Sequence, residues 1–177
     1  VEIIFEGLKK LEYRGYDSAG IAVVADNRFE VRRSQGKLAE LGRLLTQNPL
    51  SGPIGIGHTR WATHGRPSET NAHPHVAGRI ALVHNSIIEN YMELKKQLAA
   101  EGCKFSSETD SEIVAHLIDK YSKGRDLVKA VQMALKKIRG SYALVILDSQ
   151  DPHRIVAVRK ECPLILGIGE GEFFIAS

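Results

Sequence analysis

Apolar residues recur every three or four positions in five segments of the chain, which is the spacing of one helix face. The predicted helices cover residues 3–11, 38–45, 87–98, 110–121 and 127–138. Gly15, Pro49, Gly102 and Gly140 follow four of them as stop signals. Thr109-Asp110-Ser111-Glu112 has the pattern of a capping box and predicts the start of the fourth helix at residue 110.

Short apolar runs rich in β-branched residues predict strands between and after these helices. The predicted strands cover residues 19–25, 29–33, 54–57, 79–84, 142–148, 155–159, 164–168 and 173–176. Asp26-Asn27 joins the first two as a hairpin, and short turns join the last four. Strands joined by short turns are antiparallel, and the helices come in blocks rather than between all strands. The pattern therefore favours an α+β fold of helices packed on antiparallel sheets over a doubly wound parallel sheet.

The amino-acid composition excludes several classes of protein. Hydrophobic residues make up 43% of the 177 residues, which is enough to fold one globular domain and excludes a disordered chain. Lys and Arg number 24 and are interleaved with 21 Asp and Glu, so we expect no nucleic-acid partner. No apolar run reaches the ~18–20 residues of a membrane span. Two cysteines make no disulfide framework and indicate a reducing, cytoplasmic setting.

The segment from Thr59 to His75 has no clean period and predicts a long loop, a feature that is usually functional or disordered. It begins in the polar stretch Gly57–Gly65, which places Arg60, two hydroxyls, two histidines and the single Trp beside a strand end. Arg60 offers a planar fork of donors that matches a carboxylate or a phosphate. A surface loop with a structural ion pair is an equal alternative on composition alone.

Five of the seven histidines lie within 27 residues, at positions 58, 64, 73, 75 and 84. Their spacing matches no metal-ligand motif, so we expect neither a metal nor a cofactor. Cys103 and Cys162 lack a local signature of an activated nucleophile and are interpreted as structural. A thiol hydrolase that uses Cys103 and one of the clustered histidines is a distant alternative.

Two polar residues stand at predicted element boundaries, and each has a structural and a functional interpretation. Asn85 follows a strand and precedes a helix, where a helix N-cap is favoured over a donor for a developing oxyanion. Asp110 begins a helix and would compensate the helix dipole. Alternatively its carboxylate faces an ammonium group and, with Arg60, complements an amino-acid zwitterion. Spacing alone does not choose between these interpretations.

Five ordered motifs together resemble the glutaminase domains of the glutamine–fructose-6-phosphate aminotransferase family. They are residues 11–20 (LEYRGYDSAG), 58–65 (HTRWATHG), 71–75 (NAHPH), 84–90 (HNSIIEN) and 107–110 (SETD). The resemblance covers nearly the whole chain, and five motifs in order are far more specific than any one of them. The related purine-pathway amidotransferases share the plan but differ in the first two motifs, so they rank second.

The resemblance implies an N-terminal-nucleophile hydrolase fold, a four-layer αββα sandwich of two antiparallel sheets between helical layers. It implies L-glutamine as substrate and a thioester formed on an N-terminal Cys whose own α-amine acts as base. The released ammonia would pass to a sugar-phosphate isomerase domain that makes glucosamine 6-phosphate from fructose 6-phosphate. The full-length enzymes of the family tend to be homodimers.

The resemblance also assigns roles to individual residues. Arg60 would bind the glutamine α-carboxylate, with Thr63 and His64 assisting, and Asp110 would take the α-ammonium. Trp61 would belong to the loop that closes over glutamine. The oxyanion hole would be formed by the Asn85 side chain and the backbone N–H of Ser86. Arg14 and Gly15 would lie near the amine of the nucleophile.

Three departures from the family pattern limit these expectations. The sequence begins at Val1 instead of the N-terminal Cys, Ser86 stands where the family has Gly, and Ser177 falls short of the family domain's end. We therefore expect residues 1–177 to be an incomplete glutaminase domain, truncated at both ends, without the isomerase domains and inactive as written. The alternative is a catalytically dead module that keeps glutamine binding for regulation.

Overall fold

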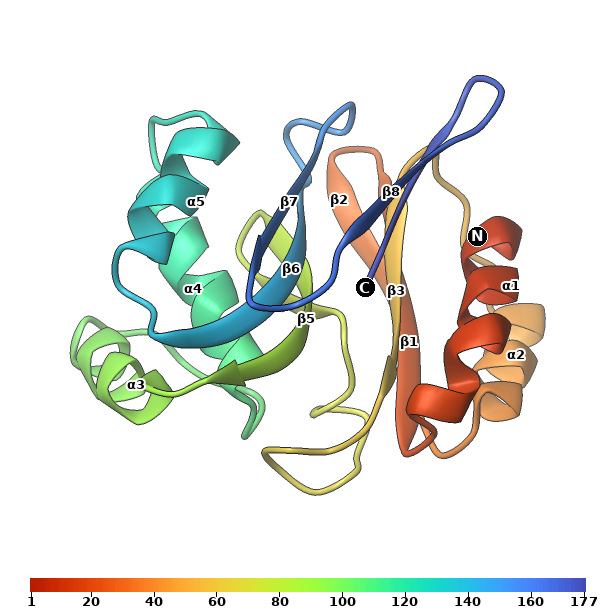
Figure 1. Ribbon diagram of the computed structural model, residues 1–177, viewed down its shortest axis with the longest axis horizontal. Coiled ribbons are helices and arrows are strands. Elements are labelled where there is room, and N and C mark those ends of the chain that lie inside the picture. The colour runs from red at the N-terminus through yellow and green to blue at the C-terminus, as the bar shows by residue number, and fades with distance from the viewer.

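The computed structural model describes all 177 residues and has four layers, two helical layers outside and two antiparallel sheets between them (Figure 1). The helices are α1 (Glu2–Leu11), the 3-10 helix η1 (Glu12–Arg14), α2 (Leu38–Gln47), α3 (Tyr91–Ala100), α4 (Asp110–Ser122) and α5 (Leu127–Leu135). Helices α1 and α2 cover one sheet, and α3, α4 and α5 cover the other. The predicted αββα arrangement is confirmed.

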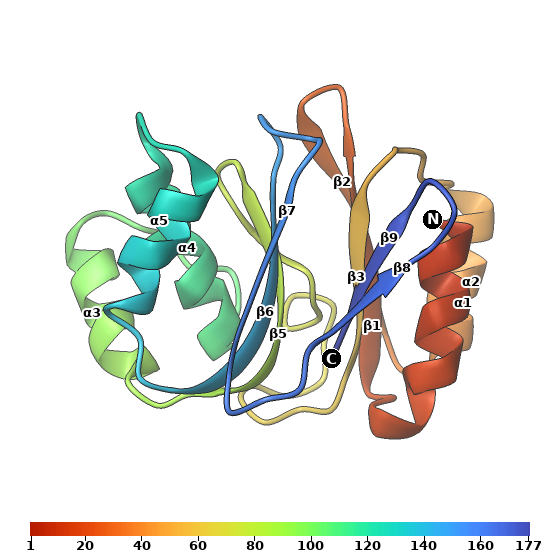
Figure 2. The ribbon, with the colours of Figure 1, turned by 45° about the horizontal axis from the view of Figure 1, so that its top comes forward.

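Two sheets form the central layers and a separate hairpin follows them. The strands are β1 (Ser18–Ala25), β2 (Arg28–Gln35), β3 (Gly55–Arg60), β4 (His75–Ala77), β5 (Ile80–Ile88), β6 (Gly140–Asp148), β7 (Ile155–Lys160), β8 (Ile165–Ile168) and β9 (Phe173–Ala176). The strand orders are β2-β1-β3, β4-β5-β6-β7 and β8-β9, with every pair antiparallel. Figure 2 shows the β8-β9 hairpin crossing in front of β3 and α1.

The apolar runs of the central strands are continuous because both faces of each strand are buried. In β1, Ile21 and Val23 pack under α1 and α2, whereas Ala22 and Val24 point toward the other sheet. Strands β5 and β6 alternate in the same way between their helices and the space between the sheets. A one-residue shift in register would exchange these faces, so the pattern fixes the pairing.

Local signals explain several element ends. Asp26 and Asn27 both have positive φ angles, as a two-residue hairpin turn requires, and they join β1 to β2 as predicted. The Thr109 hydroxyl accepts a hydrogen bond from the backbone N–H of Glu112, which confirms the predicted start of α4. No helix of the chain is both long and apolar enough to cross a membrane.

Several predicted boundaries are wrong, and three of them change the interpretation of named residues. Strand β3 continues through Thr59 and Arg60, because both pair with β1. Strand β5 continues to Ile88, so Ile87 is a strand residue and Asn90 is the N-cap of α3. Helix α5 ends at Leu135, so residues 136–138 were wrongly predicted to be helical.

The predicted loop from Thr59 to His75 is shorter at both ends, because β3 ends at Arg60 and β4 begins at His75. The pairing of β4 with β5 was missed, since three residues are too few to show a period of two.

Candidate active site

Eight of the nine predicted site residues line a single cavity of about 970 Å³ between the sheets. The eight residues are Arg14, Arg60, Trp61, Thr63, His64, Asn85, Ser86 and Asp110. The cavity is at the upper end of the size range of small-molecule sites. Its lining also includes apolar residues of α1 and of the β8-β9 hairpin.

The alternation of the two strands explains how these side chains meet. In β3, Ile56 points between the sheets, so His58 and Arg60 two and four residues later share its direction. In β5, Val83 points between the sheets, and Asn85 follows at the same period. Asn85 thus lies within a strand and faces the cavity, and the helix N-cap interpretation of this residue is wrong.

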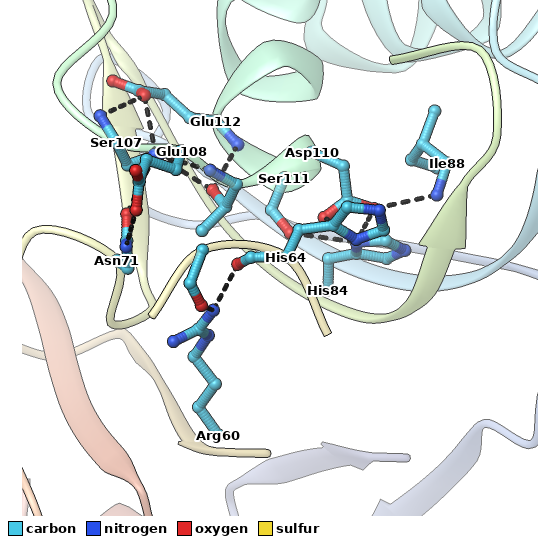
Figure 3. A network of polar contacts seen from close by, with 12 residues as sticks. Arg60, His64, Asn71, His84, Ile88, Ser107, Glu108, Asp110, Ser111 and Glu112 are labelled. Atoms are coloured by element: carbon cyan, nitrogen blue, oxygen red, sulfur yellow. Dashed lines mark hydrogen bonds and ion pairs between the residues drawn. The ribbon is translucent and has the colours of Figure 1, made fainter. Parts of the chain in front are cut away.

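Arg60 is buried at the end of β3 and held by several groups. One terminal nitrogen, Nη2, donates to the carbonyls of His64 and Gly65, the latter at 2.9 Å (Figure 3). The other, Nη1, has no hydrogen-bond partner in the protein and lies 3.5 Å from Asp17 Oδ1. Burial lowers the pKa of Arg60, and Asp17 and Asp110 oppose this. A guanidinium stays charged, so Nη1 is a buried, charged donor that has an ion-pair partner in Asp17 but makes no hydrogen bond.

Asp17 does not line the cavity but contacts Arg60, and the sequence reasoning did not assign it to the site. Its Oδ2 accepts a hydrogen bond from the backbone N–H of Ala62, and its backbone N–H donates to the Arg60 carbonyl at 3.1 Å. Asp17 therefore ties the start of β1 to the loop that follows Arg60. Only the LEYRGYDSAG motif pointed to Asp17, because this residue stands 43 positions before Arg60 and no local pattern links the two.

Asp110 is buried at the first position of α4, where the helix dipole favours a carboxylate. Its Oδ2 accepts from the backbone N–H of Ile88 at 2.8 Å (Figure 3). Its Oδ1 lies 4.0 Å from His64 Nδ1, and its Oδ2 lies 3.8 Å from His84 Nδ1. The capping and the functional interpretations are thus compatible, since Asp110 holds β5 with one oxygen and lines the cavity beside Arg60.

The start of α4 is fixed by a buried glutamate. Glu112 accepts hydrogen bonds from the backbone N–H groups of Ser106 and Ser107, at 2.8 and 2.7 Å, and from both hydroxyls (Figure 3). Burial opposes its charge, but the hydrogen bonds, with His116 nearby, outweigh burial and lower the pKa of Glu112. This cradle sets the position of Asp110, two residues earlier on the same helix turn.

Four of the clustered histidines form a packed group, and His58, His73 and His84 of this group line the cavity. The rings of His58 and His73 lie 4.3 Å apart, and those of His73 and His75 lie 4.6 Å apart. The Ser111 hydroxyl bridges His73 Nε2 and His84 Nδ1, at 2.9 and 3.0 Å. Burial lowers the pKa of all four rings, to about 4 for His58 and about 3 for His75, so they are neutral at pH 7.

The remaining predicted residues occupy the rim of the site. Trp61 is 62% exposed and packs edge-to-face on Tyr16, with ring centroids 5.5 Å apart. Thr63 is exposed. The exposed Arg14 donates from Nη1 to the Ser177 carbonyl at 2.9 Å.

Gly15 and Ser86 are special backbone positions. A Cβ on Gly15 would come within 2.7 Å of the Arg60 carbonyl carbon, so Gly15 allows β3 to approach but does not line the cavity. Ser86 has a φ of +92°, a conformation that favours glycine, and its hydroxyl lies 2.6 Å from that of Ser141.

The two cysteines are unpaired and neither lines the cavity. Cys103 packs against the helix-covered core cluster. The thiol-hydrolase alternative therefore has no support in the geometry. No group of three or more His, Cys, Asp or Glu side chains is arranged to hold a metal ion.

Comparison with known proteins supports the same interpretation as the residues that line the cavity. The sequence model of the glutamine amidotransferase domain family matches residues 58–177, which include Arg60, Asn85 and Asp110. The chain belongs to this family. Its antiparallel four-layer architecture is thus the fold of a glutamine amidotransferase domain.

Curated relatives of this amidotransferase domain are glutamine–fructose-6-phosphate aminotransferases (isomerizing). It is 55% identical to the one from Clostridium tetani, 54% to the one from Clostridium perfringens and 52% to the one from Thermus thermophilus. In each case the match covers 99% of this chain but only 29% of the relative's length.

Two solved structures are similar to this chain in fold. The glutamine phosphoribosylpyrophosphate amidotransferase from B. subtilis, complexed with ADP and GMP, superposes with a TM-score of 0.83 at 27% identity. It is matched over 98% of this chain and 38% of that chain. An allosteric regulatory enzyme of purine biosynthesis superposes with a TM-score of 0.85 at 27% identity, over the same shares.

Proposed function

We propose that this chain is the glutaminase domain of a glutamine–fructose-6-phosphate aminotransferase and that its cavity binds L-glutamine. One observation carries the proposal: the guanidinium of Arg60, the carboxylate of Asp110 and the amide of Asn85 line the same cavity, and one guanidinium nitrogen makes no hydrogen bond. This set complements the α-carboxylate, the α-ammonium and the side-chain amide of glutamine. The aminotransferase relatives share 52–55% sequence identity with this chain, whereas the phosphoribosylpyrophosphate amidotransferase structure shares 27%. This difference supports the assignment over a purine-pathway enzyme.

In the proposed complex, Arg60 Nη1 donates to the α-carboxylate of glutamine while Nη2 stays bound to the loop carbonyls. Asp110 Oδ1 accepts from the α-ammonium while Oδ2 stays bound to Ile88. The substrate side chain then points along β5, where Asn85 Nδ2 and the N–H of Ser86 would stabilise negative charge on the amide oxygen. Trp61 and Thr63 lie on the rim, where a closing loop would contact the ligand.

The ammonia product and the partners belong to the same proposal. By resemblance, ammonia released here would serve a sugar-phosphate isomerase domain, and the full-length enzyme would be a homodimer acting on fructose 6-phosphate. The unpaired thiols of Cys103 and Cys162 support the expected reducing, cytoplasmic setting.

A titration of the purified chain with L-glutamine tests the binding proposal. Arg60→Lys should weaken binding at least tenfold, because a single ammonium cannot donate to the loop carbonyls and the substrate carboxylate in a fork. Arg43→Lys is the matched control, since Arg43 lies exposed on α2 and pairs with Glu40 at 2.7 Å. Equal affinity of the wild type and the Arg60→Lys variant would show that Arg60 is only structural.

A catalytically dead glutamine-binding module is the second candidate, and one observation favours it. Ser86 has a positive φ angle, a strained backbone conformation for a residue with a side chain, at the proposed oxyanion hole. This candidate predicts glutamine binding without ammonia release from the 177-residue chain. Glutamine-dependent ammonia release by the chain would exclude it.

A further inference from the structure

His58 makes one side-chain hydrogen bond, and it is to the proposed oxyanion residue. The His58 Nε2 lies 2.8 Å from Asn85 Oδ1, across the space between the two sheets. The Asn85 amide nitrogen, Nδ2, lies 3.1 Å from the Ser177 hydroxyl on the cavity side. His58 is therefore the group that contacts the oxygen end of this amide.

The number of protons on the His58 ring determines the direction of its hydrogen bond with Asn85. Burial lowers the pKa of His58 to about 4, so the ring is neutral at pH 7 and carries a single N–H. An amide oxygen only accepts, so that proton must be on Nε2. The other ring nitrogen, Nδ1, is buried without a hydrogen-bond partner, which fits the unprotonated position.

We propose that His58 is a positioning residue that locks the Asn85 amide with its N–H donors facing the cavity and its oxygen facing away. The inference rests on the proposed function, because an amide turned the other way would present a lone pair to the developing oxyanion. A preorganised donor costs no rotation when charge develops on the substrate. His58 thus acts through Asn85 and does not touch the substrate's reacting atoms.

The ring tautomer of the ligand-free chain tests the first step. Long-range ¹⁵N–¹H correlation spectra at pH 7 distinguish protonated from unprotonated ring nitrogens, and the His58 signals are identified by their loss in His58→Gln. The expected result is His58 protonated on Nε2. Protonation on Nδ1 would overturn the inference and would leave the glutamine-binding proposal intact.

Ligand affinity tests the second step, with L-glutamine compared with L-norvaline, which lacks the side-chain amide. His58→Leu should weaken glutamine binding about three- to tenfold, because Asn85 is no longer held and the hydrogen bond from Asn85 to the glutamine side-chain amide is lost. Norvaline binding should stay unchanged, because norvaline has no side-chain amide. His58→Gln should restore most of the loss, because its amide nitrogen can donate where Nε2 does. Equal weakening of both ligands, or no rescue by Gln, would reduce His58 to a packing role and overturn the inference.

The two proposals fail separately. A wild-type chain that binds neither ligand overturns the proposed function, and the ring tautomer still decides whether His58 fixes the Asn85 amide. A wild-type chain that binds glutamine no better than norvaline overturns the assignment of Asn85 to the amide and, with it, this inference.

Discussion

Because these histidines are buried and neutral, we predict that the folded chain loses stability as the pH falls below 7. A histidine that stays neutral in the folded chain but becomes charged in the unfolded chain makes the unfolded state bind more protons. For His58 and His75, the folded pKa values of about 4 and about 3 lie below the unfolded value of about 6.5. Their contribution to stability is therefore present above pH 6.5 and is lost as the pH falls toward the folded values.

The magnitude follows from the same pKa values. Well below pH 6.5 each such histidine removes about 1.4 kcal/mol of unfolding free energy per pH unit. Between pH 7 and pH 5 this amounts to about 2 kcal/mol for each ring and about 4 kcal/mol for His58 and His75 together. Burial also lowers the pKa of His73, which adds to the loss. Domains of this kind have only about 5–15 kcal/mol of stability, so the effect is large.

Urea unfolding followed by circular dichroism at pH 7 and pH 5 measures the difference. Most carboxyl groups have pKa values below 5, so the range from pH 7 to pH 5 avoids most of their titration. His75→Gln should reduce the difference between the two pH values by about 2 kcal/mol, since Gln carries no titrating group. His153→Gln, at an exposed turn position, is the matched control and should leave the difference unchanged. Equal unfolding free energies of the wild type at both pH values would refute the reasoning.

Three further changes test the scaffold of the site. Ser86→Gly should raise the unfolding free energy by about 1 kcal/mol, because glycine relieves the positive φ angle; a lower melting temperature would contradict this. Asp17→Asn should weaken glutamine binding severalfold in titrations, because Arg60 loses its fixed counter-charge, and unchanged affinity would speak against it. Glu112→Gln should lower the unfolding free energy, measured by urea unfolding, by about 2–3 kcal/mol, because the charge-assisted hydrogen bonds from Ser106 and Ser107 weaken. An unchanged unfolding free energy would show that the Glu112 carboxylate does not stabilise the start of α4.

Much of the fold could be predicted from local signals. The hairpin at Asp26-Asn27 and the capping residue Thr109 satisfy backbone requirements within a few residues, so the sequence displays them directly. The errors fall where strands carry polar side chains. His58, Arg60 and Asn85 lie in strands but face a cavity, so they break the apolar pattern that normally marks a buried strand.

The site could be predicted only in part, because its residues meet through sheet pairing. The family resemblance named Arg60, Asn85 and Asp110, whereas spacing alone left each with a structural alternative. The role of Asp17 was missed, because its contact with Arg60 depends on the pairing of Ser18 with Arg60 across two strands. The positive φ angle of Ser86 gives a physical reason for the glycine that the family pattern has at this position.

The central claim is that Arg60 and Asp110 together recognise the two charged groups of one amino acid. Calorimetric titration of the chain with L-glutamine, with glutaramate, which lacks the α-ammonium, and with 4-aminobutanamide, which lacks the α-carboxylate, tests it most directly. We predict that glutamine binds and that each analogue binds at least tenfold more weakly, with Asp110→Asn removing most of the difference between glutamine and glutaramate. Binding of both analogues as tightly as glutamine would contradict the account.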